Sequence, residues 1–260
     1  MKVGDILIKY DRLQTILELL DETGSVKVTD LSQLLNVTEE TVRKDLDTLE
    51  QQKKLKRVRG GAFKPNTLDK EVPVLLRETM YQEEKSLMAK HCLKFIEDGD
   101  AIALDSSTTC LSIATELKKT ELKITVISNS IDIFNVLKNH HSINLIGIGG
   151  NFRSVSHSFV GMNSQSDIAR YLIDKSFISS SGLSLNIGPT DNNEAESLVR
   201  RQFLKQSQQN FLVVDHTKFD FRTIHLITDF SLIHTIITDK KPDNANWSTF
   251  LTEKNIQLIY

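Results

Sequence analysis

The stretch that decides the fold is TDLSQLLNVTEETVRKDLDTLEQQKKLKRVRGGAF, residues 29–63. Leucines at helical spacing in residues 30–35 predict a short helix, and the Asn-Val-Thr that follows interrupts the pattern. Thr38 is a favoured N-cap residue, so a second helix is expected to begin there. Two short helices joined by a tight turn indicate a helix-turn-helix.

The second helix has one apolar side and one polar side. Val42, Leu46 and Leu49 fall at i, i+4 and i+7, so they are expected to pack inward. The side chains left toward solvent are Thr41, Arg43, Lys44, Asp47 and Thr48. In a helix-turn-helix the N-terminal residues of the second helix lie against base edges in the major groove, where Arg and Lys favour guanine. The expected base-reading residues are therefore Thr38, Thr41, Arg43 and Lys44.

A basic hairpin is predicted after the second helix. Residues 53–63 mix apolar and basic side chains and turn at Gly60 and Gly61, which is typical of a wing lying on DNA phosphates. The expected phosphate-binding residues of the wing are Lys56, Arg57 and Arg59. Residues 25–28 predict a small strand against this wing, and residues 12–22 predict a supporting helix.

Positive charge is concentrated in this part of the chain. Residues 43–64 contain eight Lys or Arg and three acidic residues, a local charge of +5, in a chain whose formal net charge is -2. Such local basicity is what the neutralisation of phosphates requires. The alternative is that Arg43 and Lys44 merely form a solvated helix face paired with Asp47 and Asp45.

Composition indicates two soluble domains. The chain has 260 residues, of which 39% are hydrophobic and 25% charged. No apolar run approaches the roughly 20 residues that span a bilayer, and residues 1–9 lack the apolar core of a signal peptide, so a cytoplasmic protein without a membrane partner is expected. Neither the two cysteines nor the adjacent His140 and His141 have the spacing of a metal site, and no cofactor is expected.

The rest of the chain predicts a separate α/β domain. Residues 1–64 are expected to form the helix-turn-helix domain, residues 65–73 a polar linker, and residues 74–260 the second domain, beginning with one long or broken helix to residue 98. The predicted strands are 101–104, 124–127, 143–148, 176–179, 211–214, 224–228 and 234–238. The predicted helices between them are 109–118, 132–139, 164–173 and 195–206. This alternation predicts a mostly parallel sheet that is covered on both faces.

Polar or flexible loops follow five of the predicted strands, at residues 105–109, 128–130, 149–150, 179–182 and 215–218. Ligands of open α/β sheets bind beyond the carboxyl ends of the strands, so these loops are expected to converge on one pocket. Hydroxyls at a helix start suit a phosphate, carboxylates and amides suit sugar hydroxyls, and a Lys or Arg neutralises an anionic group. The expected effector-binding residues are Asp105, Ser106, Ser107, Thr108, Thr109, Ser128, Asn129, Ser130, Gly149, Gly150, Glu196, Arg200, Asp215 and Lys218. Cys110 is expected to be an apolar packing residue.

The chain resembles the DeoR/GlpR-type family of bacterial transcriptional regulators from about residue 12 to at least residue 219. In the head, the likeness lies in TVRKDL at 41–46 and RVRGGA at 57–62, where Lys44 and Arg59 replace the usual Arg and His of the family. In the second domain, Ser107 and Arg200 stand where the family usually has Gly and Lys. The other matching segments are 98–100, 105–109, 128–130, 149–150, 158–161, 174–177, 196–201 and 215–219.

The resemblance implies a winged helix-turn-helix repressor whose C-terminal domain has the fold of sugar-phosphate isomerases and binds a phosphorylated sugar or a related metabolite. It implies a non-enzymatic regulator of a sugar-metabolism operon that binds double-stranded operator DNA as a homo-oligomer, a dimer or a tetramer. The competing hypothesis is a sugar-phosphate isomerase with a DNA-binding regulatory head, in which Glu196, Asp215 or Asp105 is the base and Lys218 stabilises an enediolate. Activation in place of repression is a third hypothesis.

Overall fold

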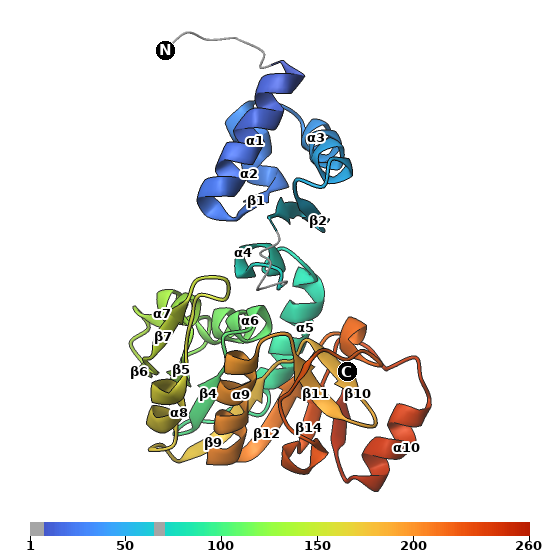
Figure 1. Ribbon diagram of the computed structural model, residues 1–260. Coiled ribbons are helices and arrows are strands. Elements are labelled where there is room, and N and C mark those ends of the chain that lie inside the picture. Colours follow the sequence, from blue (N-terminus) through green and yellow to red (C-terminus); the bar gives the residue numbers. More distant parts are fainter. Residues whose placement is uncertain (1–7, 65–70) are drawn as a thin grey trace. The chain divides into compact units, whose positions relative to one another are not determined.

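The computed structural model describes residues 8–64 and 71–260. The chain divides into two compact units, Met1–Met80 and Tyr81–Tyr260, which are coloured from blue to teal and from teal to red in Figure 1. This boundary lies later than the predicted start of the second domain at residue 74. The short helix α4 (Val74–Arg77) contacts strand β1 (Ser25–Lys27) of the first unit, and Val74 and Leu76 are buried there. Most of the predicted linker, residues 65–70, lies outside the described residues.

The first unit is a winged helix-turn-helix, as predicted. Its other helices are α1 (Lys9–Thr23), α2 (Val28–Leu35) and α3 (Glu39–Gln51), and its other strands are β2 (Lys56–Val58) and β3 (Gly61–Phe63). The three strands form an antiparallel sheet in the order β1-β3-β2. The helices pack on one core in which Ile16, Val42 and Leu46 are fully buried.

The second unit is built on a seven-stranded sheet in which every strand pair is parallel. In sheet order the strands are β15 (Gln257–Ile259), β14 (Thr235–Ile237), β12 (Ser207–Val213), β9 (Ile173–Ile178), β4 (Ala101–Leu104), β5 (Ile124–Ser128) and β6 (Ile143–Gly147). The predicted parallel sheet is confirmed. Strand β15 was not predicted.

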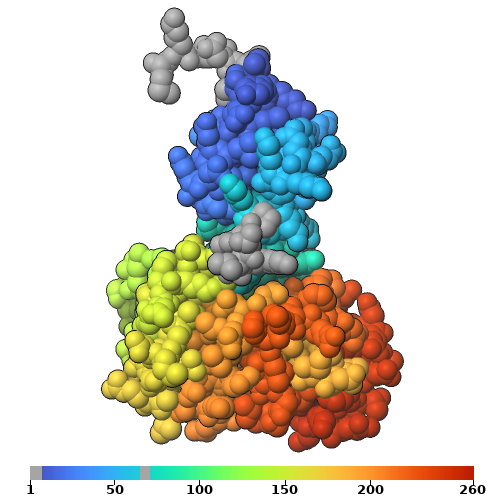
Figure 2. All heavy atoms as spheres, viewed as in Figure 1, coloured from blue at the N-terminus to red at the C-terminus, as the bar shows by residue number. Residues whose placement is uncertain are grey.

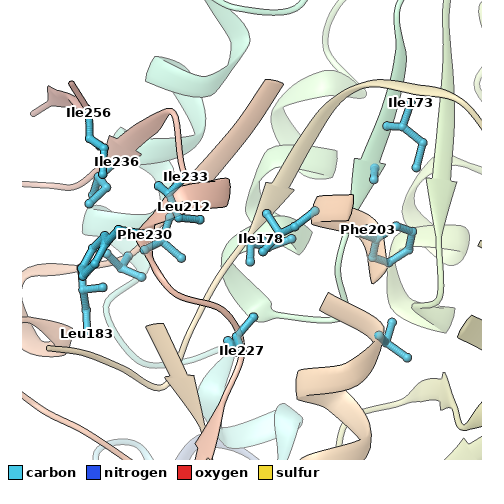
Figure 3. Close-up of a cluster of buried hydrophobic side chains, with 14 of the residues drawn as sticks. Ile173, Ile178, Leu183, Phe203, Leu212, Ile227, Phe230, Ile233, Ile236 and Ile256 are labelled. Carbon is cyan, nitrogen blue, oxygen red and sulfur yellow. The ribbon is translucent and has the colours of Figure 1, made fainter. Parts of the chain in front are cut away.

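Helices cover both faces of this sheet, as predicted. The helices are α5 (Gln82–Leu93), α6 (Thr108–Leu117), α7 (Ile131–Leu137), α8 (Met162–Ile168), α9 (Glu194–Gln206) and α10 (Asn246–Glu253). Helices α5, α6 and α7 share a core with Ile102 and Leu104 of β4, whereas α8, α9 and α10 share another with Ala103. Successive side chains of a strand point to opposite faces, so one strand supplies both cores. Figure 3 shows part of the second core.

Smaller elements lie outside the seven-stranded sheet. They are a hairpin of β7 (Asn151–Arg153) and β8 (Ser158–Val160), a small antiparallel sheet of β10 (Gly182–Ser184), β11 (Gly188–Asp191) and β13 (His225–Leu226), and two 3-10 turns, η1 (His216–Lys218) and η2 (Phe230–Leu232). The predicted strand 224–228 therefore belongs to the small sheet and not to the main one. The predicted helix 74–98 is broken between α4 and α5, where Tyr81 has a left-handed backbone with φ 54°.

Candidate functional site

Helix α3 is fixed to its unit by one apolar side and one buried carboxylate. The Thr38 hydroxyl accepts a hydrogen bond from the backbone N–H of Thr41, so the predicted N-cap is confirmed. Asp45 is only 2% exposed, and it accepts a hydrogen bond of 2.8 Å from Nε of Arg12 in α1. Because such a buried ion pair joins α3 to α1, the orientation of α3 is set by the core and by this pair.

Two of the four predicted base-reading side chains, Arg43 and Lys44, lie on the exposed surface of α3. The Arg43 and Lys44 side chains are 45% and 72% exposed, and the light-blue atoms of α3 lie at the surface of the first unit in Figure 2. The alternative pairing with Asp47 and Asp45 is wrong. Arg43 instead pairs with Glu39, and Lys44 pairs with Glu40 at 3.5 Å. Thr38 is exposed and Thr41 half-buried.

The wing follows the predicted turn. Gly60 has φ 90°, and a Cβ on Gly61 would stand 2.2 Å from the carbonyl oxygen of Val26. Lys56 and Arg59 are exposed, whereas Arg57 is half-buried and pairs with Asp47 of α3. The wing is thus tied to α3 through Arg57, and part of the positive charge counted in the sequence is neutralised within the unit.

The five predicted loops of the second unit lie along one edge of its sheet. They follow β12, β9, β4, β5 and β6, which are consecutive neighbours and all parallel. The chain leaves β4 toward β5 and β6 on one side, and its later strands β9 and β12 lie on the other. The strand order therefore reverses between β4 and β9, which is the crevice where open α/β sheets bind ligands.

A buried ion-pair network occupies this crevice. Nε of Arg200 donates to Asp105 at 2.6 Å, and its Nη1 donates to Asp191 at 2.6 Å. Asp105 also accepts hydrogen bonds from the backbone N–H groups of Ser107 and Ser179. Burial by itself raises the pKa of the Asp105 carboxyl, but the Arg200 charge and these donors outweigh it and hold the pKa below its ordinary value.

Glu196 holds a second part of the network. It accepts hydrogen bonds from the hydroxyls of Ser106 at 2.8 Å and of Ser156 and Ser158 at 2.6 Å each. Burial raises the pKa of Glu196, but the Arg200 charge and the three hydroxyls outweigh this effect and hold the pKa below its ordinary value. Arg200 is 4% exposed, and neighbouring carboxylates raise its pKa well above the ordinary value although burial opposes this.

Ser107, which replaces the usual glycine of the family in the loop before α6, has an ordinary backbone conformation. Ser107 has φ -74°, and its hydroxyl accepts from the backbone N–H of Cys110, so it is the N-cap of α6. Thr108 and Thr109, the first helical residues, are buried at this helix start. The Cys110 thiol donates to the carbonyl oxygen of Phe177, and Cys110 is fully buried, which confirms it as a packing residue.

The polar groups in the loops after β5 and β6 mainly form hydrogen bonds with nearby residues. Ser128 and Ser130 accept from backbone N–H groups, and the Gly149 carbonyl accepts from the Ser164 hydroxyl. A Cβ on Gly150 would lie 2.1 Å from Oγ of Ser164. In contrast, Oδ1 of Asn129 is buried without a hydrogen-bond partner among the described residues, and so is Oγ of Ser180 after β9. Buried polar atoms without a partner are uncommon in folded proteins, so these two atoms call for an explanation.

Asp215 and Lys218 form a separate group. Lys218 pairs with Asp215 at 3.3 Å, and its Nζ lies 5.7 Å from the centre of the Tyr81 ring. His216, between them, bonds to Asp239 through Nδ1 at 2.6 Å. Burial raises the pKa of Asp215, but Lys218 and Thr217 lower it to below its ordinary value. Within residues 71–260 of the structure, no hydrogen bond or ion pair joins Asp215 or Lys218 to the Arg200 network.

The expected effector-binding residues did not include Asp191, Ser156, Ser158 or Ser180, although Ser180 lies in the predicted loop 179–182 and Ser158 in the matching segment 158–161. Ser156 and Ser158 come from the β7–β8 hairpin, which was not predicted, and Asp191 ends β11, which was not predicted either. Within the described part of the chain, no group of three or more His, Cys, Asp or Glu is placed to hold a metal ion. No described helix is both long and apolar enough to cross a bilayer.

Comparison with known proteins agrees with this architecture of a winged helix-turn-helix followed by an α/β unit. Residues 12–67 match the DeoR-like helix-turn-helix domain, and residues 80–240 match the DeoR C terminal sensor domain. The chain is 34% identical to the HTH-type transcriptional regulator YulB of Bacillus subtilis over 92% of both chains. It is 30% identical to a lactose phosphotransferase system repressor of Staphylococcus epidermidis over 89% of this chain and 92% of that one.

The chain therefore belongs to the DeoR family of transcriptional regulators. This membership places it among regulators and not among enzymes. Among solved structures, ribose 5-phosphate isomerase A of Methanocaldococcus jannaschii is similar with a TM-score of 0.40 and 16% identity, covering 53% of this chain and 54% of the isomerase.

Proposed function

We propose that this protein is a sequence-specific repressor that binds operator DNA through α3 and the wing, and releases it when a phosphorylated sugar binds the second unit. The observation that carries the DNA half is the open side of α3. Arg43 and Lys44 project from a helix whose other side is fixed by a fully buried core and by the Arg12–Asp45 pair. A rigid helix with exposed cations is what insertion into a major groove requires.

The ion pairs of the free protein do not oppose this role. Arg43 and Lys44 pair with Glu39 and Glu40 on the exposed surface, where such pairs contribute little stability. Replacing these partners by guanine or phosphate therefore costs little free energy. Lys56 and Arg59 of the wing are exposed and suited to contact phosphates. Reading of a two-fold operator calls for two copies of the head, so we propose that the protein acts as a homo-oligomer.

The effector site is proposed at the crevice between β4 and β9. Oδ1 of Asn129, after β5, and Oγ of Ser180, after β9, belong to the loops on either side of β4, and neither has a partner among the described residues. Both atoms can accept hydrogen bonds from ligand hydroxyls. The Arg200 network is no phosphate site by itself, because the Arg200 charge is already matched by Asp105 and Asp191. We assign the phosphate group to the start of α6, where Ser106, Thr108 and Thr109 lie, and propose Lys218 from the loop after β12 as its counter-charge.

The isomerase hypothesis is not favoured. A general base works best when its pKa lies near the working pH, whereas Asp105, Glu196 and Asp215 all have pKa values below the ordinary range. Glu196 is occupied by three hydroxyls, and Lys218 bonds Asp215 and Thr217 on another loop. The relatives named above are regulators and a repressor, which supports repression of a sugar operon.

The proposal is tested with the purified full chain and a labelled duplex from its own promoter region. A panel of phosphorylated sugars is first screened by thermal shift, because a ligand selective for the native state raises the unfolding midpoint. A sugar phosphate that raises the midpoint is then added to the preformed DNA complex. Release of the duplex by the phosphorylated sugar, and not by the free sugar, is the expected result. A complex that no tested sugar phosphate dissociates contradicts the effector half.

A further inference from the structure

The outermost stripe of helix α3 begins with an acidic residue. Each residue of an α-helix advances about 100° around the axis, since a turn holds about 3.6 residues. The side of α3 directly opposite the buried Val42, Leu46 and Leu49 is therefore occupied by the exposed residues Glu40, Lys44, Asp47 and Gln51. The Glu40 side chain is 65% exposed and lies in the first helical turn. The neighbouring Glu39 side chain is 45% exposed and does not belong to this stripe.

Glu40 makes only weak interactions in the free protein. The N-cap of α3 is Thr38, whose hydroxyl already accepts from the Thr41 N–H, so Glu40 is not needed as a cap. The contact of its carboxylate with Lys44 is long, at 3.5 Å, and both side chains are largely exposed. Glu39 makes a shorter contact with Arg43. A favourable interaction of Glu40 with the helix dipole remains as the purely structural explanation.

In a DNA complex the Glu40 carboxylate would weaken binding unless it formed a favourable contact with the DNA. The first turn of a recognition helix lies against base edges, between two rows of phosphates, so an exposed carboxylate there is repelled by the DNA. A carboxylate only accepts hydrogen bonds. Among base edges in the major groove, cytosine offers the N4 amino donor without the neighbouring N7 acceptor that adenine carries.

We propose that Glu40 determines operator specificity by accepting a hydrogen bond from the N4 amino group of a cytosine in each half-site. This inference rests on the proposed function, because it takes α3 to be the helix that enters the groove. When Glu40 turns to the base, Lys44 is released for a guanine or a phosphate about 6 Å further along the helix axis. Glu40 then discriminates among bases, and the two Thr and two basic residues that were predicted from the sequence are not the complete set of readers.

The test is selection of binding sites from a randomised duplex pool, carried out in parallel with the wild-type protein, Glu40→Gln and Glu39→Gln. The last two variants change the charge equally in the same helical turn, so Glu39→Gln is the matched control. We expect wild type to select cytosine at one position of each half-site. Glu40→Gln is expected to lose that preference, or to change it to adenine, whose N6 and N7 fit a glutamine amide. Discrimination at that position should change by at least about fivefold, the lower end for one base contact.

The control separates specificity from charge. Both variants are expected to bind duplexes of unrelated sequence more tightly, because each removes a negative charge next to the DNA, but only Glu40→Gln is expected to change the selected base. Identical selected sequences for wild type and Glu40→Gln would overturn this inference while leaving the proposed function standing. Selection of no sequence at all by wild type would overturn both. Thermal unfolding of each variant checks that the head is folded.

Discussion

Replacement of Arg200 by Met tests whether the second unit depends on its buried charge network. The substitution keeps an unbranched side chain of similar length but leaves Asp105, Asp191 and Glu196 without the guanidinium that they share. These carboxylates are 1%, 3% and 1% exposed. Removal of one partner from a buried ion pair costs about 3–5 kcal/mol, against a total stability of about 5–15 kcal/mol for a domain. We expect a loss of this size at pH 7.

The assay is urea unfolding of the full chain followed by tryptophan fluorescence. The chain has one tryptophan, Trp247, which is fully buried in a core of the second unit, so the signal reports on that unit. Arg170→Met is the control, because Arg170 is 78% exposed and its pair with Asp167 is 3.5 Å long. The control should stay within about 0.5 kcal/mol of wild type.

The pH dependence provides a second criterion. Asp105 and Glu196 have lowered pKa values in the folded protein, so their contribution to stability is present above the ordinary carboxyl pKa of about 4 and is lost as the pH falls through the folded values. The difference between wild type and Arg200→Met should therefore be present at neutral pH and should shrink as the pH falls below about 4. An Arg200→Met protein as stable as wild type at pH 7 would refute the role of the network.

Three further predictions concern other parts of the chain. Gly61→Ala should abolish DNA binding without moving the Trp247 unfolding midpoint, since its Cβ meets the Val26 carbonyl oxygen at 2.2 Å; retained binding would contradict the described wing. Lys218→Met should reduce the thermal shift produced by a phosphorylated sugar but not the shift produced by its unphosphorylated analogue, and an equal effect on both would remove Lys218 from the phosphate site. Burial raises the pKa of the Cys92 and Cys110 thiols, so alkylation at pH 8, followed by mass spectrometry, should occur only after denaturation.

Local patterns in the sequence were sufficient for the head. The cap at Thr38, the spacing of Val42, Leu46 and Leu49, and the Gly60 turn all depend on near neighbours, and the structure has each of them. Asp45 shows the limit of such patterns. It lies within a basic helix, and the spacing of apolar residues did not place it in the core, but its partner Arg12 is 33 residues away and makes its burial possible.

In the second unit, too, local patterns were predictable whereas long-range partners were not. Alternating apolar runs were enough to predict parallel strands, and their shared direction brings the polar loops to one edge of the sheet. The internal partners of the site residues were not predictable in this way. Arg200 was expected to face a ligand anion, whereas it is enclosed by Asp105 and Asp191, and Glu196 is bonded to Ser156 and Ser158 of an unpredicted hairpin.

The most direct test of the central claim is a fluorescence anisotropy titration of the promoter duplex with wild type, Arg43→Met and Lys90→Met over a range of salt concentrations. Lys90 is exposed on α5 and serves as the control for loss of one positive charge. We predict a sequence-preferring complex that weakens steeply with salt for wild type and Lys90→Met, and a loss of sequence preference for Arg43→Met. Equal binding of promoter and unrelated DNA by all three proteins would contradict the account.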